Sequence, residues 1–155
     1  MDTQARDNLR QLLHDCRWAA LATNNAHDSA EIAQIAFALS FEPLSLLFHL
    51  STLAKHTRNL LERPQCALSI FEADDGRADP QTLARVSLSG SVANISRDAL
   101  DYAHSKSIYL ARLPMAEPRF DFGDFHLFRM SIAAGQYVGG FARAFRVNSE
   151  DLATL

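Results

Sequence analysis

The chain has 155 residues, 48% of them hydrophobic and 21% charged, with a formal net charge of −3 and a pI near 6.0. These values predict a single globular domain, residues 1–155, with a sizeable core, and they argue against a nucleic-acid-binding protein because no long basic run is present. No apolar run reaches the roughly 18 residues that a membrane span requires, and the polar N-terminus is unlike a signal peptide, so we expect no membrane partner.

Cysteine and histidine usage predicts neither a disulfide nor a metal site. Cys16 and Cys66 lie far apart within apolar patterns, so each is expected to be a small buried hydrophobic residue. Free thiols of this kind are typical of a reducing compartment, which favours a cytoplasmic protein. None of the six histidines pairs with another at the i, i+3 or i+4 spacing of metal ligands.

The first half of the chain predicts one helix followed by three strands. Leucines recur at helical spacing within residues 2–17, and Asp2 or Thr3 can cap the start of this helix. The expected strands cover residues 18–23, 33–41 and 45–49.

The strand expected at residues 33–41 has two different faces. Its odd positions are Ala, Ile, Phe, Leu and Phe, and this period of two predicts that they face the core. Its even positions carry Gln34, Ala36, Ala38 and Ser40, which are mostly small. The even face could therefore be a seat for a flat ligand, or it could simply pack against another element.

A short helix is expected between Ser51 and Pro64. Ser51 and Thr52 are good N-cap residues, and proline blocks continuation of the helix at its end. The first turn carries Lys55 and His56, although the helix dipole favours acidic residues there. A phosphate could bind at this helix start. The alternative is a solvated amphipathic helix with ordinary basic residues.

The second half of the chain predicts strands, one longer helix and a short helical tail. Arg85 begins a strand with apolar residues on one face and small polar residues on the other, so it could approach a ligand or could pair with an acid of the preceding loop. The expected elements are strands at 66–71, 85–92, 125–132 and 137–147, a helix at 97–109 capped by Ser96, an irregular segment at 112–123, and a helix at 150–155. This order favours an antiparallel β-barrel with peripheral helices, which is a mainly β (α+β) fold.

Three segments resemble one known group of proteins. Residues 48–60 (FHLSTLAKHTRNL), 85–90 (RVSLSG) and 137–144 (YVGGFARA) resemble the FMN-binding split-barrel superfamily, and within it the haem-iron utilisation (HugZ-like) branch of the pyridoxamine 5′-phosphate oxidase-related proteins. The resemblance implies an antiparallel split β-barrel that forms a homodimer, with FMN at the subunit interface and a small-molecule redox substrate.

The resemblance also implies roles for individual residues. The strand at residues 34–37 would lie along the flavin, residues 49–51 would contact the ribityl phosphate region, and Lys55 with His56 would bind the phosphate. Arg85 would approach the flavin ring. The implied cofactor-binding residues are Gln34, Ile35, Ala36, Phe37, His49, Leu50, Ser51, Lys55, His56, Arg85, Phe141 and Arg143.

The sequence departs from the family pattern at several positions. Lys55 and His56 replace the usual Arg-Lys pair, the C-terminal Trp and paired Arg of true pyridoxamine 5′-phosphate oxidases are absent, and no histidine follows His126. We therefore expect an FMN-dependent oxidoreductase of unknown substrate that does not oxidise pyridoxamine 5′-phosphate. The alternatives are a haem-binding or haem-utilisation protein on the same fold and a dimerisation module that binds no cofactor.

Overall fold

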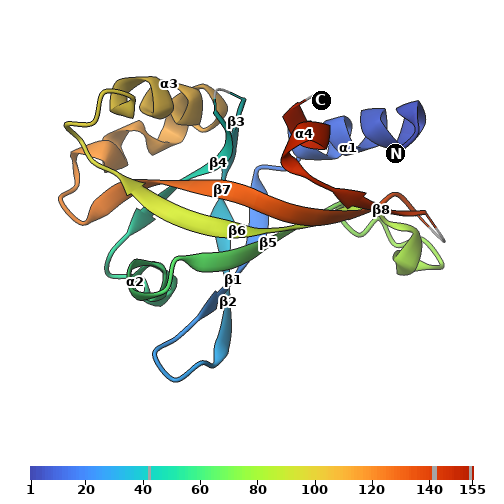
Figure 1. Ribbon diagram of the computed structural model, residues 1–155, viewed down its shortest axis with the longest axis horizontal. Coiled ribbons are helices and arrows are strands. Elements are labelled where there is room, and N and C mark those ends of the chain that lie inside the picture. The colour runs from blue at the N-terminus through green and yellow to red at the C-terminus, as the bar shows by residue number, and fades with distance from the viewer. Residues whose placement is uncertain (42, 141–142, 154) are drawn as a thin grey trace.

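The computed structural model describes residues 1–41, 43–140, 143–153 and 155, and its strands form one antiparallel sheet (Figure 1). The strands follow the order β2-β1-β5-β6-β7-β4-β3, and β8 pairs with β7 outside this path. The sheet is strongly bent but not closed, so the expected antiparallel split β-barrel is confirmed. The strands are β1 (Trp18–Asn24), β2 (Ala30–Ala36), β3 (Ala38–Phe41), β4 (Leu44–Ser51), β5 (Gln65–Phe71), β6 (Arg85–Ile95), β7 (Phe125–Val138) and β8 (Ala144–Val147).

Helices cover the ends of the sheet, as the sequence predicts. In Figure 1, α1 and α4 lie together near both chain ends, α3 covers the end that carries β3 and β4, and α2 lies beside the β1–β2 hairpin. None of the helices among the described residues is long and apolar enough to cross a membrane. The helices are α1 (Thr3–Asp15), α2 (Lys55–Glu62), α3 (Tyr102–Arg112) and α4 (Ser149–Ala153), with 3-10 helices η1 (Pro80–Thr82) and η2 (Pro114–Asp121).

Apolar side chains form two cores. The larger core fills the concave side of the sheet and includes Leu9 and Leu12 of α1 with Phe48 and Phe128 of the sheet. The smaller core lies between β4, α3 and η2, and Tyr109 and Phe120 are its largest members. Because β4 contributes alternate residues to both cores, nearly every residue of this strand is buried.

The prediction of one strand at residues 33–41 is wrong. β2 ends at Ala36 and pairs with β1, whereas β3 begins at Ala38 and pairs with β4. Phe37 forms the corner between them, where its N–H donates to the carbonyl oxygen of Arg17 at 3.2 Å. The alternation reverses across this corner, so Phe41 is exposed and Ser40 is buried.

The break predicted between residues 132 and 137 is also wrong, because β7 is continuous from Phe125 to Val138. A bulge opposite Ser89 and Gly90 takes up one extra residue and keeps the long β6–β7 ladder paired on both sides of it. The single strand predicted at residues 137–147 is wrong as well, because β7 ends at Val138 and β8 begins at Ala144; the expected bend does occur at Gly140, between them.

Helix starts were predicted with mixed success. Asp2 caps α1 by accepting a hydrogen bond from the N–H of Ala5 at 2.8 Å, and Asn148 caps α4 by accepting one from the N–H of Asp151 at 2.8 Å. Ser96 does not cap α3, because the helix begins only at Tyr102 and the Ser96 hydroxyl binds the Asp98 carboxylate instead.

The two cysteines are free thiols, but only one of them is buried. Cys66 lies in the larger core, where burial raises the pKa of its thiol to about 12. Cys16 follows α1 and is half-buried, with its sulfur donating to the carbonyl oxygen of Phe71 at 3.4 Å. Full burial of Cys16 was therefore a wrong prediction.

Candidate functional site

Ser51, expected to cap the helix at the candidate phosphate site, ends β4 instead. The helix α2 begins four residues later at Lys55, and Ala54 precedes it without a side-chain cap. The Ser51 hydroxyl donates to the Asp124 carboxylate and accepts a hydrogen bond from the N–H of Leu53 at 3.1 Å. The hydroxyl is therefore engaged in holding the β4–α2 corner to the start of β7.

Lys55, in the first turn of α2, forms an ion pair with Glu31 of β2. The distance from Lys55 Nζ to Glu31 Oε1 is 2.6 Å, and the side chain of Glu31 is only 21% exposed. The carboxylate also accepts hydrogen bonds from Asn25 Nδ2 at 2.8 Å and from Asn59 Nδ2 at 3.0 Å. Hydrogen bonds from Lys55, Asn25 and Asn59 lower the pKa of Glu31 to about 2, so the carboxylate is ionised at neutral pH.

His56 supplies no second fixed positive charge at this helix start. The side chain is half-buried, and desolvation lowers its pKa below the ordinary value of 6.5. The imidazole is therefore neutral at neutral pH, and the charge of Lys55 is balanced by Glu31. The basic first turn of α2 predicts a negative group nearby. That group is the carboxylate of Glu31, which belongs to the chain itself.

Glu31, Asn25 and Asn59 build this cluster, although their residue types and spacing did not predict a site. Glu31 pairs with the buried Thr23 in the β1–β2 ladder, so both face the inner side of the sheet, and this register is visible only in the folded sheet. Asn59 Nδ2 also donates to Thr23 Oγ1 at 3.0 Å. Burial of a glutamate on the inner face requires partners, and the nearest helix provides them.

The outer face of the bent sheet is built mainly from small side chains. Outward positions of β1, β5 and β6 meet in rows, such as Ala22, Ala67 and Ser89. Large apolar side chains stand around them: Trp18 is 60% exposed, Ile32 76% and Phe71 50%. Gln34 and Ala36, two of the expected cofactor residues, lie on this face opposite Ala20 and Trp18, respectively.

Three expected cofactor residues lie in the larger core. Ile35, Phe37 and Leu50 pack on the inner side of the sheet, and each is at least nine-tenths buried. Their side chains are thus separated from those of Gln34 and Ala36 by the sheet itself. The residues at 34–37 do not share one ligand-facing surface.

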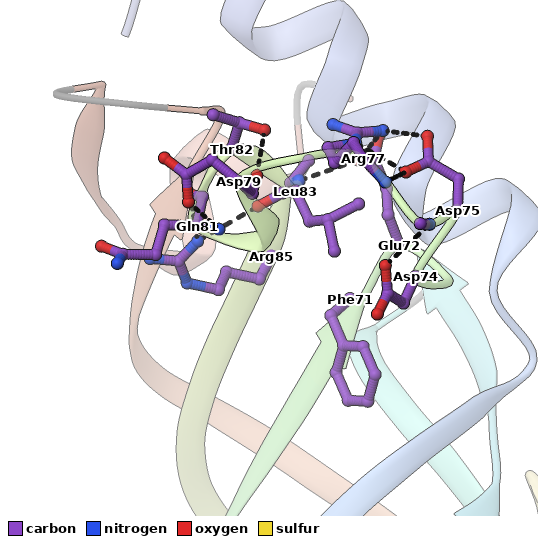
Figure 2. A network of polar contacts seen from close by, with 12 residues as sticks. Phe71, Glu72, Asp74, Asp75, Arg77, Asp79, Gln81, Thr82, Leu83 and Arg85 are labelled. Atoms are coloured by element: carbon purple, nitrogen blue, oxygen red, sulfur yellow. Dashed lines mark hydrogen bonds and ion pairs between the residues drawn. The ribbon is translucent and has the colours of Figure 1, made fainter.

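Arg85 folds back over the preceding loop and does not point across the sheet. Its Nη1 donates to the carbonyl oxygens of Gln81 at 3.0 Å and of Leu83 at 3.1 Å, as Figure 2 shows. The alternative of pairing with a loop acid is also not what occurs, because Arg77 makes the acid contacts in this loop, to Asp75 at 2.8 Å. Arg85 remains at the edge of the outer face, next to Phe71 in the β5–β6 ladder.

His49 lies in the smaller core, on the opposite side of β4 from Leu50. Its ring stacks on Phe120 with centroids 3.7 Å apart and an interplanar angle of 5°. Nδ1 is buried without a hydrogen-bond partner among the described residues. Burial, with smaller contributions from Arg119, Arg97, His126 and Lys106, lowers the pKa of His49 to about 4, so this ring is a neutral core group.

The remaining two expected cofactor residues come from the β7–β8 connection. Arg143 forms an ion pair with Asp2, the N-cap of α1, at 2.8 Å. Phe141 lies outside the described residues. An apolar hollow of about 320 Å³ lies elsewhere, and it is lined by Arg10, Leu13, His14, Leu39, Phe41, Arg112 and Leu155.

Six of the twelve expected cofactor residues gather in two places. One place is the β4–α2 corner, which holds Ser51, Lys55 and His56. We call these three residues, together with Glu31, Asn25 and Asn59, the α2 cluster. Gln34, Ala36 and Arg85 belong to the outer face of the sheet. Among the described residues, no group of three or more His, Cys, Asp or Glu side chains could hold a metal ion.

Comparison with known proteins identifies relatives of the whole fold. The family model described as CREG, beta-barrel, matches residues 2–153. A non-canonical heme oxygenase, HOZ, from the chloroplast of Arabidopsis thaliana is 37% identical over 106 residues, which cover 68% of this chain and 31% of the plant protein. The chain therefore spans about a third of the length of this relative.

Solved structures share the fold at lower identity. A heme binding protein from Mycobacterium smegmatis superposes with a TM-score of 0.85 at 23% identity, over 99% of this chain and 62% of that one. HutZ, the heme storage protein of Vibrio cholerae, gives a TM-score of 0.74 at 18% identity, over 90% and 92% of the two chains. At these identities the structural likeness bears on the fold alone.

Proposed function

Since the chain belongs to the CREG β-barrel family, we propose that it is a haem-binding protein that serves in haem utilisation. The plant relative at 37% identity is named as a heme oxygenase, and two proteins with the same fold are named for heme binding and heme storage. These names support haem over FMN as the ligand.

The observation that carries the proposal is the outer face of the sheet. A haem macrocycle is broad, flat and largely apolar, and it needs a surface on which small side chains let it approach closely. Trp18, Ile32 and Phe71 supply exposed apolar area around a floor of alanine and serine side chains. The exposed Arg146, opposite Gln136 in the β7–β8 ladder, supplies a cation that could pair with a propionate.

FMN fits the described residues less well. Its phosphate carries close to two negative charges and requires cations at the helix start, whereas the charge of Lys55 is balanced by Glu31 and His56 is neutral. We therefore place the flavin-dependent oxidoreductase second to the haem-binding protein.

We propose further that the protein is a homodimer with the ligand between the two outer faces. Exposed apolar side chains gathered on one sheet face are typical of a surface that another molecule covers. A second copy would also enclose a bound macrocycle, which one sheet face alone leaves open to water.

The chain would contribute binding, orientation and the exclusion of water, while bound haem would supply the iron chemistry. We assign the described residues of the outer face to binding and not to catalysis. They are mainly alanine, serine and large apolar side chains, which do not transfer protons at neutral pH.

Titration with haemin, followed by the Soret band, tests the proposal. The wild-type protein should give a saturable spectral change, and replacing Trp18 and Phe71 together by Ala should weaken binding by about tenfold or more, because each removes apolar contact area. Leu53→Ala is the matched control, since Leu53 is 75% exposed but lies beside α2 and away from the outer face.

Two results would contradict the proposal. One is the absence of a saturable Soret change with the wild-type protein. The other is purification of the protein with stoichiometric flavin that haemin does not displace.

A further inference from the structure

We propose that Glu31 determines ligand specificity by keeping phosphate-bearing cofactors such as FMN away from the start of α2. The chain would thereby be restricted to ligands that need no phosphate seat. The inference deepens the proposed function and rests on it only for the identity of the preferred ligand; the exclusion of phosphate is argued from the α2 cluster alone.

The Glu31 carboxylate lies against the ammonium group of Lys55. Glu31 Oε1 lies 2.6 Å from Lys55 Nζ, which is the distance of a strong charge-assisted hydrogen bond. Lys55 begins α2 and has a fixed charge at neutral pH, whereas the neighbouring His56 is half-buried and neutral; Arg58, the other fixed cation of this turn, is exposed. The carboxylate thus occupies the position at which a phosphate oxygen would meet this ammonium group.

The carboxylate is also anchored. Asn25 Nδ2 donates to one oxygen at 2.8 Å and Asn59 Nδ2 donates to the other at 3.0 Å. Asn59 is itself buried and is held by Thr23 at 3.0 Å. Turning Glu31 away from Lys55 would break both hydrogen bonds, and the loss is most costly at Asn59 because this side chain is buried.

A phosphate at the start of α2 would meet the negative charge of Glu31. A phosphate bound to Lys55 would stand on the order of 5 Å from the Glu31 carboxylate, because both anions would contact the same ammonium group. At that separation two like charges repel each other appreciably even near a protein surface. The free N–H groups of the helix start attract anions, but only by about 0.3–1 kcal/mol at exposed sites.

Two single substitutions of Glu31 would remove its repulsion of a phosphate: one introduces a neutral side chain and the other a smaller one. Glu31→Gln removes the charge and keeps one acceptor oxygen, so it preserves the hydrogen bond from either Asn25 or Asn59 and loses the other. Glu31→Ala removes the charge without adding an amide, and it carries the test if the first variant does not fold. Asp28→Asn is the matched control, because Asp28 pairs with Arg63 and so also joins the β1–β2 hairpin to the end of α2.

The experiment measures the affinity of each variant for FMN and for riboflavin, which lacks the phosphate, by quenching of flavin fluorescence. We expect Glu31→Gln and Glu31→Ala to bind FMN at least tenfold more tightly than wild type, with riboflavin affinity unchanged. Asp28→Asn should behave like wild type toward both flavins. Haemin affinity should stay within about twofold in all variants.

Several outcomes would overturn the inference: an unchanged FMN affinity in the folded Glu31 variants, an equal gain for riboflavin, an equal gain in Asp28→Asn, or tight FMN binding by the wild type. Failure of the haem proposal would be seen separately. If haemin does not bind but the Glu31 variants gain FMN affinity selectively, the proposed function is wrong and the role of Glu31 stands.

Discussion

Glu31 and His49 both have strongly shifted pKa values, but for opposite physical reasons. Three hydrogen-bond donors stabilise the charged form of Glu31 and lower its pKa to about 2. Burial among aromatic rings destabilises the charged form of His49 and lowers its pKa to about 4. Glu31 is therefore charged and His49 neutral at neutral pH, which makes the first an electrostatic group and the second a packing group.

The buried His49 should make the protein sensitive to mild acid. In the unfolded chain this histidine takes up a proton near its ordinary pKa of 6.5, whereas in the folded protein it does so only near 4. The unfolded state binds more protons between these values, so stability falls as the pH drops through this window. His49→Phe, which keeps an aromatic ring against Phe120, should flatten this dependence and be more stable than wild type by roughly 1–2 kcal/mol near pH 5.

Chemical denaturation between pH 4 and 8 measures this effect. At pH 8 the histidine is neutral in both states, so His49→Phe and wild type should differ by no more than about 1.5 kcal/mol, as for other volume-conserving core changes. His104→Phe is a suitable control because His104 is exposed. Parallel pH profiles for wild type and His49→Phe would show that burial of His49 is not the source of the acid sensitivity.

At the residue scale, the sequence located Lys55 and His56 correctly in the first turn of a helix but not the state of their charges. Residue type and spacing reveal that a cation stands at a helix start. They do not reveal that Glu31, more than twenty positions earlier, reaches it across the β1–β2 hairpin, because that contact depends on how α2 packs on the sheet.

At the scale of elements, the pairing of β6 with β7 is central to the sheet. Gly90 is the glycine of this pairing with the least space for a side chain. A Cβ atom at Gly90 would clash with the backbone carbonyl of Ser131 on the neighbouring strand, next to the bulge. Backbone cannot move aside as a flexible side chain can, so Gly90→Ala should destabilise the protein by about 1–3 kcal/mol. The measurement is the midpoint of urea unfolding.

Gly123→Ala is the control for this substitution. Gly123 lies between η2 and β7, and a Cβ atom there meets nothing within 4 Å. This variant should stay within about 0.5 kcal/mol of wild type, as surface substitutions usually do. Equal stability of Gly90→Ala and Gly123→Ala would show that the ladder relaxes around the added methyl group.

The strands themselves were largely predictable, and the exceptions have a common cause. Residues 66–71 and 85–92 alternate between apolar and polar side chains because each strand has one covered and one open face. The sequence of residues 33–41 keeps a period of two across Phe37, although the chain there changes its hydrogen-bonding partner from β1 to β4 and the buried positions change from odd to even. Sequence periodicity alone does not reveal such a change of partner, and the sides assigned to residues beyond it are then reversed.

At the scale of the whole molecule, the predicted order of elements indicated an antiparallel barrel, and the family resemblance specified that the barrel is split. The cofactor residues were less predictable, because the resemblance identifies positions along the chain and this structure distributes them over different surfaces. Gln34 is on the outer face, Ile35 in the larger core and His49 in the smaller core. Only residues that share a surface can hold one ligand, and that grouping emerges from the folded sheet.

The outer face also leads to a prediction about assembly. Ile32 is 76% exposed at the edge of this face, near Ala22 and Ala67 of the neighbouring strands, so a second copy that buries the face would desolvate it. A stable interface buries on the order of 800 Å² per partner, and a charge in such a surface without a partner is strongly unfavourable. Light scattering should therefore give twice the chain mass of 17.2 kDa for wild type and a single chain mass for Ile32→Asp.

Leu53→Asp separates this specific effect from a general effect of added charge. Leu53 is as exposed as Ile32, at 75%, but it lies beside α2, where no interface is proposed, so this variant should remain dimeric. Because the ligand is proposed to lie between the two outer faces, Ile32→Asp should also lose haemin affinity while Leu53→Asp keeps it. A wild-type protein that is monomeric at micromolar concentration and still binds haemin would place the ligand on a single chain and would refute the shared site.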